Sequence, residues 1–367
     1  MRIPIVNLKP SLAETQGVWQ QNLDSMMERG FFILGPELSR FEESLAAAMG
    51  AGFAIGVSSG STAIEICLRD AGITDAKQEV LTSALTAPFT AVSIAAAGGT
   101  PRFADINPET LQVDAEDLAD RIGKKTAALV PVHLYGQPCE IRSIAKTAKK
   151  HGLALIQDAC QSHGALPFTQ YGDYVALSFY PTKNLGCLGD GGAILTGKAS
   201  FAKRLRQIRD GGRGSGGLPQ NQIAYVKGIN ARLDELQCCY LNAFLPRLAQ
   251  WNDQRRRLAE VYDKMLAGVD GVQVIHRGPE SVCHLYVVRA AKRDRLREYL
   301  GKLGIGTGIH YPVPLHLHPA FAAAKQKPGS LPHAEKAAKE IVSLPLWPQL
   351  PVEQVEECAE AVRRFYA

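Results

Sequence analysis

The sequence predicts an α/β protein with a mostly parallel central sheet in a large domain and a small α+β domain at the C-terminus. Short, almost wholly apolar runs alternate with amphipathic helical patterns through the first half of the chain. Strands that are apolar on both faces need helices on both sides, which is typical of parallel sheets. Because single cores stop growing at roughly 250–300 residues, the 367 residues indicate two domains, which we place at 1–245 and 246–367.

The first half of the chain supplies the expected sheet and its covering helices. The capping box Ser39-Arg40-Phe41-Glu42 predicts a helix start, and Gly50 predicts the end of that helix. The apolar residues 53–57 then predict the first strand. Further strands are expected at 79–83, 101–106, 127–132, 153–157, 174–179 and 191–196, and helices at 88–97, 114–122, 141–151 and 201–209.

The pattern changes after the last of these strands. A glycine-rich loop is expected at 211–217, followed by a long helical stretch, 233–266, with a break or kink at Pro246. One strand, 285–289, then precedes a helix at 294–303. Two more helices are expected at 334–342 and 352–365, and this mixed tail predicts the small C-terminal domain.

Composition excludes several classes of protein. The net charge of +5 is too mild to argue for nucleic acid, although it suits a phosphorylated ligand. The eight cysteines contain no CxxC pair, so we expect reduced thiols and no disulfides. The start of the sequence has no signal-peptide pattern, and the most apolar stretch, 84–99, is too short to span a bilayer. A cytoplasmic protein that does not enter membranes is therefore expected.

Asp158 and Lys183 are the residues that say most about chemistry. An apolar run ends in Asp158, and one strand later a second apolar run leads to Lys183 in a glycine-rich loop. Pyridoxal phosphate (PLP) needs such a pair, because an acid keeps its ring nitrogen protonated and a lysine forms the Schiff base. Taken singly, the two residues read as a strand-end turn cap and a solvated surface lysine.

Together with their neighbours, the two residues carry a family resemblance. The segments Asp158-Ala159-Cys160-Gln161-Ser162-His163-Gly164-Ala165 and Ser178-Phe179-Tyr180-Pro181-Thr182-Lys183-Asn184-Leu185-Gly186 closely resemble the nucleotide-sugar aminotransferases of the DegT/DnrJ/EryC1/StrS family. Further motifs follow in the family's order at 35–37, 58–62, 228–237 and 306–312. The resemblance therefore runs nearly end to end.

The resemblance implies PLP-dependent fold type I and an aminotransferase that uses PLP. Its amino donor would be L-glutamate, which leaves as 2-oxoglutarate, and its acceptor a keto-sugar of a nucleoside-diphosphate sugar. The lysine loop and the 306–312 motif look most like members that aminate the sugar at C3. The alternatives are a 4-amino-forming enzyme and a sensory or regulatory PLP-binding protein without turnover. A sugar dehydratase is disfavoured, because related dehydratases lack the lysine.

A phosphate site is expected where Gly60 and Ser61 follow the 53–57 strand and open a helix. Free amides at a helix N-terminus, beside a glycine that allows close approach, bind anions. Simple N-capping by Ser59 or Ser61 explains the same residues equally well. The resemblance favours the phosphate.

Two further phosphate ligands are implied by the resemblance alone. Ser178 matches the serine whose hydroxyl binds the PLP phosphate, and Asn230 matches the asparagine that reaches the phosphate from the neighbouring subunit. The assignment of Asn230 implies a homodimer with shared active sites. Locally, Asn230 reads just as well as a turn residue ahead of a helix.

The remaining site residues are also assigned by resemblance. Gln161 matches the residue that contacts the PLP ring hydroxyl, and His310 with Tyr311 belongs to the wall of the sugar pocket. His163 is either packed under the ring or catalytic. Family members often stack an aromatic residue on the cofactor where this chain has Ala87, so that residue is left open, with Phe89 as one candidate.

Two other features suggest different functions. The basic segment 203–213 looks like a nucleic-acid patch, but its apolar residues keep helical spacing and no aromatic residues interleave, which favours a solvated helix face beside a mobile loop. His310, His316 and His318 lack the spacing of a known ligand set, so we expect no metal.

Overall fold

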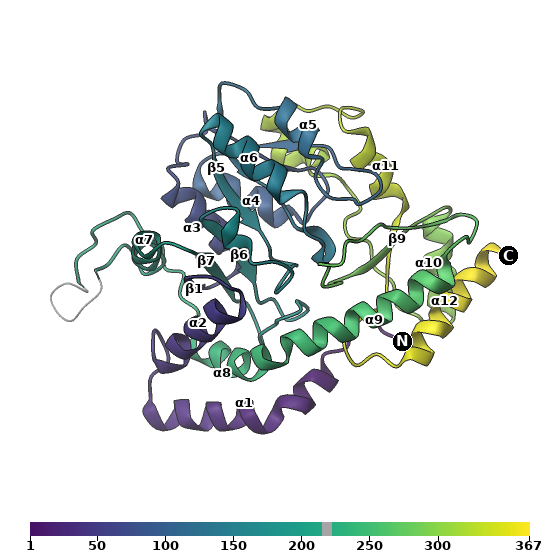
Figure 1. The fold of residues 1–367 in the computed structure, drawn as a ribbon, viewed down its shortest axis with the longest axis horizontal. Helices are drawn as coiled ribbons and strands as arrows, with labels where there is room; N and C mark the ends of the chain where they lie inside the picture. Colours follow the sequence, from purple (N-terminus) through teal and green to yellow (C-terminus); the bar gives the residue numbers. More distant parts are fainter. Residues whose placement is uncertain (215–221) are drawn as a thin grey trace.

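The computed structural model describes residues 1–214 and 222–367, and its centre is a seven-stranded sheet in the order β1-β7-β6-β5-β4-β2-β3. Figure 1 shows the sheet with helices on both sides. The predicted α/β class is confirmed. The strands of this sheet are β1 Phe53–Val57, β2 Glu79–Ser83, β3 Thr100–Ala104, β4 Thr126–Val130, β5 Ala154–Asp158, β6 Tyr174–Ser178 and β7 Gly192–Thr196. Its helices include α3 Gly60–Asp70, α4 Pro88–Ala97, α5 Ala115–Asp120, α6 Ile141–His151 and α7 Ala199–Arg209.

The direction of the strands decides where the site can lie. Strands β2 to β6 pair in parallel, whereas β7 is antiparallel to both β6 and β1. Strand β1 consequently runs in the same direction as β5 and β6. Val57, Asp158 and Ser178, the last residues of β1, β5 and β6, therefore all face the same edge of the sheet. Ligands of open α/β sheets bind at this edge.

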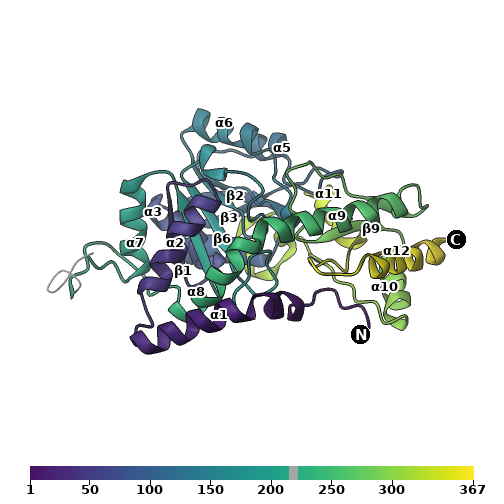
Figure 2. The same cartoon turned by 60° about the horizontal axis from the view of Figure 1, so that its bottom comes forward.

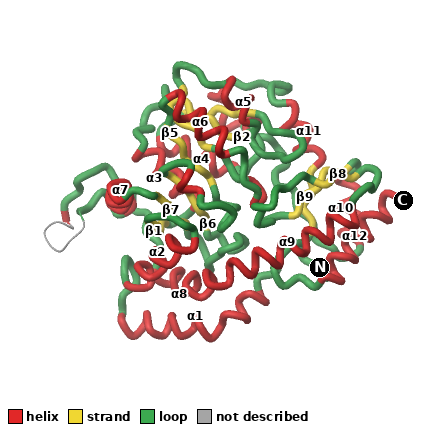
Figure 3. The backbone as a smooth tube through the Cα atoms, viewed as in Figure 1, coloured by secondary structure: helices red, strands yellow, loops and turns green. Residues whose placement is uncertain are grey.

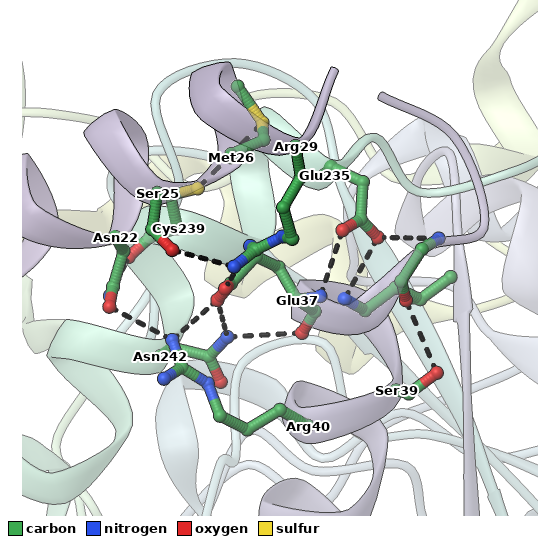
Figure 4. A network of polar contacts seen from close by, with 12 residues as sticks. Asn22, Ser25, Met26, Arg29, Glu37, Ser39, Arg40, Glu235, Cys239 and Asn242 are labelled. Atoms are coloured by element: carbon green, nitrogen blue, oxygen red, sulfur yellow. Dashed lines mark hydrogen bonds and ion pairs between the residues drawn. The ribbon is translucent and has the colours of Figure 1, made fainter. Parts of the chain in front are cut away.

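Helix α2, Pro36–Ala48, begins three residues before the predicted capping box. Ser39 does not cap the helix, because its hydroxyl donates to the Gly35 carbonyl at 3.2 Å inside the first turn. The fully buried carboxylate of Glu235 takes the capping role and accepts hydrogen bonds at 2.8–2.9 Å from the amides of Gly35, Glu37 and Leu38 (Figure 4). A carboxylate from α8 thus satisfies amides that a helix start leaves free.

Helix α1, Lys9–Arg29, was not predicted from the sequence. It lies along α8, Glu235–Phe244, in both Figure 1 and Figure 2. The rings of Trp19 and Tyr240 are 4.9 Å apart, and the Asn22 side chain donates to the Cys239 carbonyl at 2.9 Å. The N-terminal helix is therefore held by tertiary contacts with α8.

The long helical stretch is broken where Pro246 predicts it. A 3₁₀ turn, Leu245–Arg247, separates α8 from α9, Leu248–Leu266. After α9 come the three-stranded antiparallel sheet β10-β9-β8 and the helices α10 Arg293–Lys302, α11 Pro332–Glu340 and α12 Val352–Tyr366. Figure 3 shows part of this second sheet, β8 and β9, apart from the central one. The domain boundary at 245/246 remains a prediction.

The second sheet contains two strands that the sequence did not predict. They are β8, Val272–Val274, and β10, Ile341–Leu344, which flank the predicted β9, Tyr286–Ala290. The helix expected at 334–342 ends at Glu340, because Ile341 and Val342 pair with β9 instead. Ile3, near the N-terminus, is buried in the same hydrophobic cluster as residues of α12.

All eight cysteines are free thiols. Within residues 1–214 and 222–367, none of the helices has the length and apolar character needed to cross a membrane. Part of the predicted loop at 211–217 lies outside the described residues.

Candidate active site

A cavity of about 730 Å³ opens at the edge of the sheet where β1, β5 and β6 end. It brings together most of the site residues expected from the sequence. Those that line it are Gly60, Ser61, Asp158, Gln161, Ser178, Lys183, His310 and Tyr311. His163 and Asn230 do not line it.

Lys183 follows β6 in a turn closed by a 2.8 Å hydrogen bond from its own amide to the Tyr180 carbonyl. Burial lowers the pKa of the Lys183 ammonium below its ordinary value, while Cys160 and Asp158 act in the opposite direction. A lysine needs a depressed pKa to act as a nucleophile or to exchange protons near neutral pH. The cavity thus favours the amine form of Lys183.

Asp158 ends β5 and is 5% exposed. One carboxylate oxygen accepts a hydrogen bond from the Thr90 hydroxyl at 2.8 Å, and the other accepts one from the Cys160 amide at 3.1 Å. These two donors orient the carboxylate and leave further lone pairs for a protonated ring nitrogen. Thr90, from α4, was missed by the sequence reasoning, which considered its segment only as a source of a stacking aromatic residue.

The start of α3 combines a capping hydroxyl with two free amides, which we call the cradle. The Ser59 hydroxyl caps the helix and accepts a hydrogen bond from the Thr62 amide at 3.1 Å. The Gly60 and Ser61 amides have no hydrogen-bond partner among the described residues. Capping by Ser59 is therefore confirmed, and the phosphate site stays a prediction, which the two free amides allow.

Gly60 packs closely against the end of β6 and the Cys160 thiol, which leaves no room for a side chain at this position. A Cβ atom at Gly60 would lie 2.6 Å from Ser178 Cβ and 2.8 Å from Cys160 Sγ. Ser178 itself ends β6, and its hydroxyl accepts a hydrogen bond from the Tyr180 amide at 3.3 Å. The helix start and the serine hydroxyl therefore adjoin each other.

His163 lies behind this cradle rather than in the cavity. It is fully buried, and its Nε2 is 2.8 Å from the Ser178 carbonyl oxygen. Its Nδ1 has no partner among the described residues. Burial, with Lys183 as a second cause, lowers the pKa of His163 to about 3. The imidazole is therefore neutral at physiological pH and positions the end of β6.

The opposite wall comes from the C-terminal part of the chain. Gln161 donates to the Tyr311 hydroxyl at 3.2 Å, and its carbonyl accepts from the Tyr135 amide at 2.7 Å. The Tyr135 hydroxyl donates in turn to the His310 carbonyl. Burial, followed by the charge of Lys183, lowers the pKa of His310 to about 4, so this ring is neutral as well. Gln161 thus ties the sheet edge to the wall.

The comparisons with known proteins agree with this geometry. Residues 14–363 match the DegT/DnrJ/EryC1/StrS aminotransferase family. This chain belongs to that family. The predicted family and the fold type are confirmed.

Two relatives match almost the whole chain. A protein of Geobacillus stearothermophilus called "Pleiotropic regulatory protein" is 40% identical, over 100% of this chain and 99% of the relative. A dTDP-3-amino-3,4,6-trideoxy-alpha-D-glucose transaminase of Streptomyces venezuelae is 38% identical, over 99% of this chain and 96% of the relative. The crystal structure of S. venezuelae DesV in complex with a ketimine intermediate has a TM-score of 0.93 and 37% identity, covering 99% of this chain and 98% of that one.

The cofactor of this aminotransferase family is PLP, and the residues around the cavity fit it. The free amides beside Gly60 suit its phosphate, the oriented carboxylate of Asp158 suits its ring nitrogen, and the Lys183 amine suits its aldehyde. When bound, PLP supplies an electron sink for the carbon that exchanges the amino group.

Asn230 is not brought to the cavity of its own chain. It is exposed and forms an isolated bridge with Asp210 beyond the end of α7. Its predicted contact with a phosphate in a neighbouring subunit therefore remains a prediction. The stacking residue is also left open, since Ala87 and Phe89 both line the cavity and the Phe89 side chain is 62% exposed.

The basic segment is helical up to Arg209, as expected, and two of its arginines form ion pairs with other helices. Arg209 is buried and pairs with Glu42, and Arg204 pairs with Asp70 at 2.8 Å. Both cations serve to hold α7 against the rest of the fold.

The three histidines considered as metal ligands make separate contacts. His310 bonds to the Ser343 hydroxyl, His316 to the Glu335 carboxylate and His318 to the Val313 carbonyl. In the part of the chain that the structure describes, no group of three or more His, Cys, Asp or Glu residues could hold a metal ion.

Proposed function

We propose that this enzyme moves an amino group from L-glutamate to a keto-sugar of a nucleoside-diphosphate sugar, at C3. The observation that carries the proposal is the single cavity shared by Asp158, Lys183 and the free amides at the start of α3. The name of the Streptomyces relative, a 3-amino-sugar transaminase, supports the C3 position. The cavity volume of about 730 Å³ supports a substrate that binds beside the cofactor.

The residues would divide the work as follows. Lys183 would hold the cofactor through its amine and would carry the proton that moves during amino transfer. Asp158 keeps the ring nitrogen protonated. Gly60, Ser61 and Ser178 hold the phosphate, and Gln161 orients the ring. Glutamate leaves as 2-oxoglutarate, and the ketone carbon of the sugar receives the amino group.

A homodimer with shared active sites is part of the proposal. An exposed apolar group surrounds the start of α8, where Phe32 accepts a backbone hydrogen bond from Glu235 and the Leu188 amide bonds to the Gln237 side chain. Phe32, Leu188 and Leu236 are 42–50% exposed. Exposed apolar patches commonly mark protein interfaces. In the proposed dimer, a second copy bound to this surface would bring Asn230 to the PLP phosphate of the partner subunit. We also place the protein in the cytoplasm.

The alternative is a regulatory PLP-binding protein without turnover, which the name of the Geobacillus relative favours. A half-reaction with L-glutamate separates the two functions. Conversion of bound PLP to its amine form, followed by absorbance, is expected of an aminotransferase. A pure binder would leave the spectrum unchanged.

The position of amination needs a test of its own. A nucleoside-diphosphate 3-amino sugar should be deaminated in the presence of 2-oxoglutarate, while the matched 4-amino sugar should not. NMR of the sugar products and assay of glutamate compare the two isomers. Preferred turnover of the 4-amino isomer would refute the C3 assignment and would leave the aminotransferase function intact.

A further inference from the structure

Arg255, on α9, is a buried cation at the active-site cavity that the functions above do not use. Its side chain is 4% exposed and lines the cavity together with Lys183. The two residues also line a neighbouring small cavity of about 40 Å³. Arg255 therefore borders the same two spaces as the reactive lysine.

The guanidinium has one occupied edge and one free edge. Nη1 donates to the carbonyl oxygens of His284 at 3.3 Å and Leu346 at 3.2 Å. Nε is buried without a hydrogen-bond partner, and among the described residues no carboxylate pairs with Arg255. Buried polar groups are almost always hydrogen-bonded, and a buried charge is normally paired. The Nε–Nη2 edge therefore lacks an acceptor that a bound carboxylate would provide.

The charges near Arg255 also suit an anion. Burial, with Cys283 opposing it, lowers the pKa of Arg255 to about 10, which leaves the group charged at neutral pH. His284, the next buried polar side chain on this wall, is held neutral by its own burial and by the charges of Lys183 and Arg255, which lower its pKa. Asp158, the acid that lines the same cavity, accepts its hydrogen bonds from Thr90 and Cys160 and not from Arg255.

We propose that Arg255 binds the α-carboxylate of the amino donor through its free edge. This inference rests on the proposed aminotransferase function. The α-carboxylate is attached to the carbon whose amino group reacts beside Lys183, so its binding group must border the lysine. The diphosphate of a nucleotide sugar is separated from the reacting carbon by the sugar ring. A planar guanidinium edge binds a carboxylate with two parallel hydrogen bonds, which also orients the donor.

The test compares the two half-reactions in separate experiments with the PLP-loaded enzyme. Arg255→Lys keeps the charge but loses the planar edge, and Arg255→Met removes both. The KM for glutamate should rise by about tenfold to a hundredfold, as expected when a hydrogen bond to a charged group is lost. The half-reaction of the amino sugar should change little. Arg257→Met, on the exposed face of the same helix, is the matched control and should leave both reactions unchanged.

Glutamine provides a second arm, because it keeps the α-carboxylate and lacks the γ-carboxylate. An equal loss with glutamate and glutamine supports the α-carboxylate, whereas a loss with glutamate alone overturns it. Equal losses in the donor and sugar half-reactions would mean a structural role and also overturn the proposal. If Arg255→Met does not fold, Arg255→Lys is compared with the wild type instead. Glutarate should then compete with glutamate less well in Arg255→Lys than in the wild type, and equal competition would overturn the proposal.

The result separates this inference from the proposed sugar chemistry. A wild-type enzyme that reacts with glutamate in an Arg255-dependent way but with no amino sugar would refute the sugar substrate and support the donor site. If the enzyme reacts with amino sugars but the Arg255 variants bind glutamate as the wild type does, the sugar substrate is supported and the donor site is refuted.

Discussion

Gly60→Ala tests the phosphate cradle most directly, because the clash it causes is defined by the structure. The added methyl group would lie 2.6 Å from Ser178 Cβ and 3.2 Å from Ser178 Cα, as well as 2.8 Å from Cys160 Sγ. Two of these atoms belong to the end of β6 rather than to the tip of a flexible side chain. Either α3 or the end of β6 must therefore move away.

The expected magnitude follows from the cost of overpacking. An inserted methyl group without space costs about 1–3 kcal/mol. If α3 moves so that its amides no longer bind the phosphate, that cost corresponds to a dissociation constant for PLP that is roughly 5- to 150-fold higher. If the strain is already present in the apo protein, that part of the cost lowers the free energy of unfolding of the apo form and does not change PLP binding.

The assay measures both quantities for the same protein. Fluorescence titration of apo protein gives the PLP dissociation constant, and denaturant unfolding gives the stability. Gly17→Ala is the matched control, because a methyl group there, in α1, meets nothing within 4 Å. It should be neutral or stabilise by up to about 1 kcal/mol. An unchanged dissociation constant together with unchanged stability for Gly60→Ala would refute the cradle geometry.

Other substitutions test the remaining parts of the site. Lys183→Ala should abolish the borohydride-reducible PLP adduct, and its persistence would show that another lysine is used. Asp158→Asn should keep PLP bound while turnover falls by about 100- to 1,000-fold, and near-normal turnover would identify another acid. Lys183→Ala and Asn230→Ala proteins, each impaired alone, should regain activity after subunit exchange, and no recovery despite proven exchange would place Asn230 outside the partner's site. Burial lowers the pKa of His133 to about 3, while an unfolded histidine has a pKa of about 6.5. The contribution of His133 to the free energy of unfolding is therefore complete above about pH 6.5 and falls by about 2 kcal/mol by pH 5. His133→Gln should reduce this loss of stability at acid pH in urea unfolding, and an unchanged dependence of stability on pH would contradict the reasoning.

Local sequence signals were sufficient for most of the central sheet. The runs at 53–57 and 79–83 are both strands with the predicted bounds, and all but the first residue of each are buried. The helix Ile141–His151 ends at Gly152, which adopts the left-handed conformation that favours glycine. In these elements, burial and end signals agree with each other.

The elements that were missed depend on partners distant in the sequence. Helix α1 buries only Thr15 and Met26, so its apolar periodicity is weak and its position depends on α8. Residues 341–342 continue an alanine-rich helix without a break signal, and only pairing with β9 makes them a strand. The helix start at Gly35 was misplaced for the same reason, because its capping group, Glu235, lies 200 positions away.

The site shows the same division between local and distant information. Asp158 and Lys183 could be predicted because one ends a strand, the other follows one, and each lies in a distinctive motif. Thr90 and Arg255 could not, since one looked like part of an aromatic-binding segment and the other like one of three consecutive arginines on a helix. Only the tertiary structure shows that Thr90 bonds to Asp158 and that Arg255 is buried.

The common direction of β1, β5 and β6 explains why such scattered residues meet. If β7 were antiparallel to only one of its two neighbours, β1 would run opposite to β5 and β6, and Gly60 would emerge at the other edge of the sheet from Asp158. With β7 reversed on both sides, β1 regains the direction of β6. The start of α3 is then delivered beside Ser178, close enough for a methyl group on Gly60 to clash with it. The cradle therefore depends on the topology of the sheet as much as on the glycine.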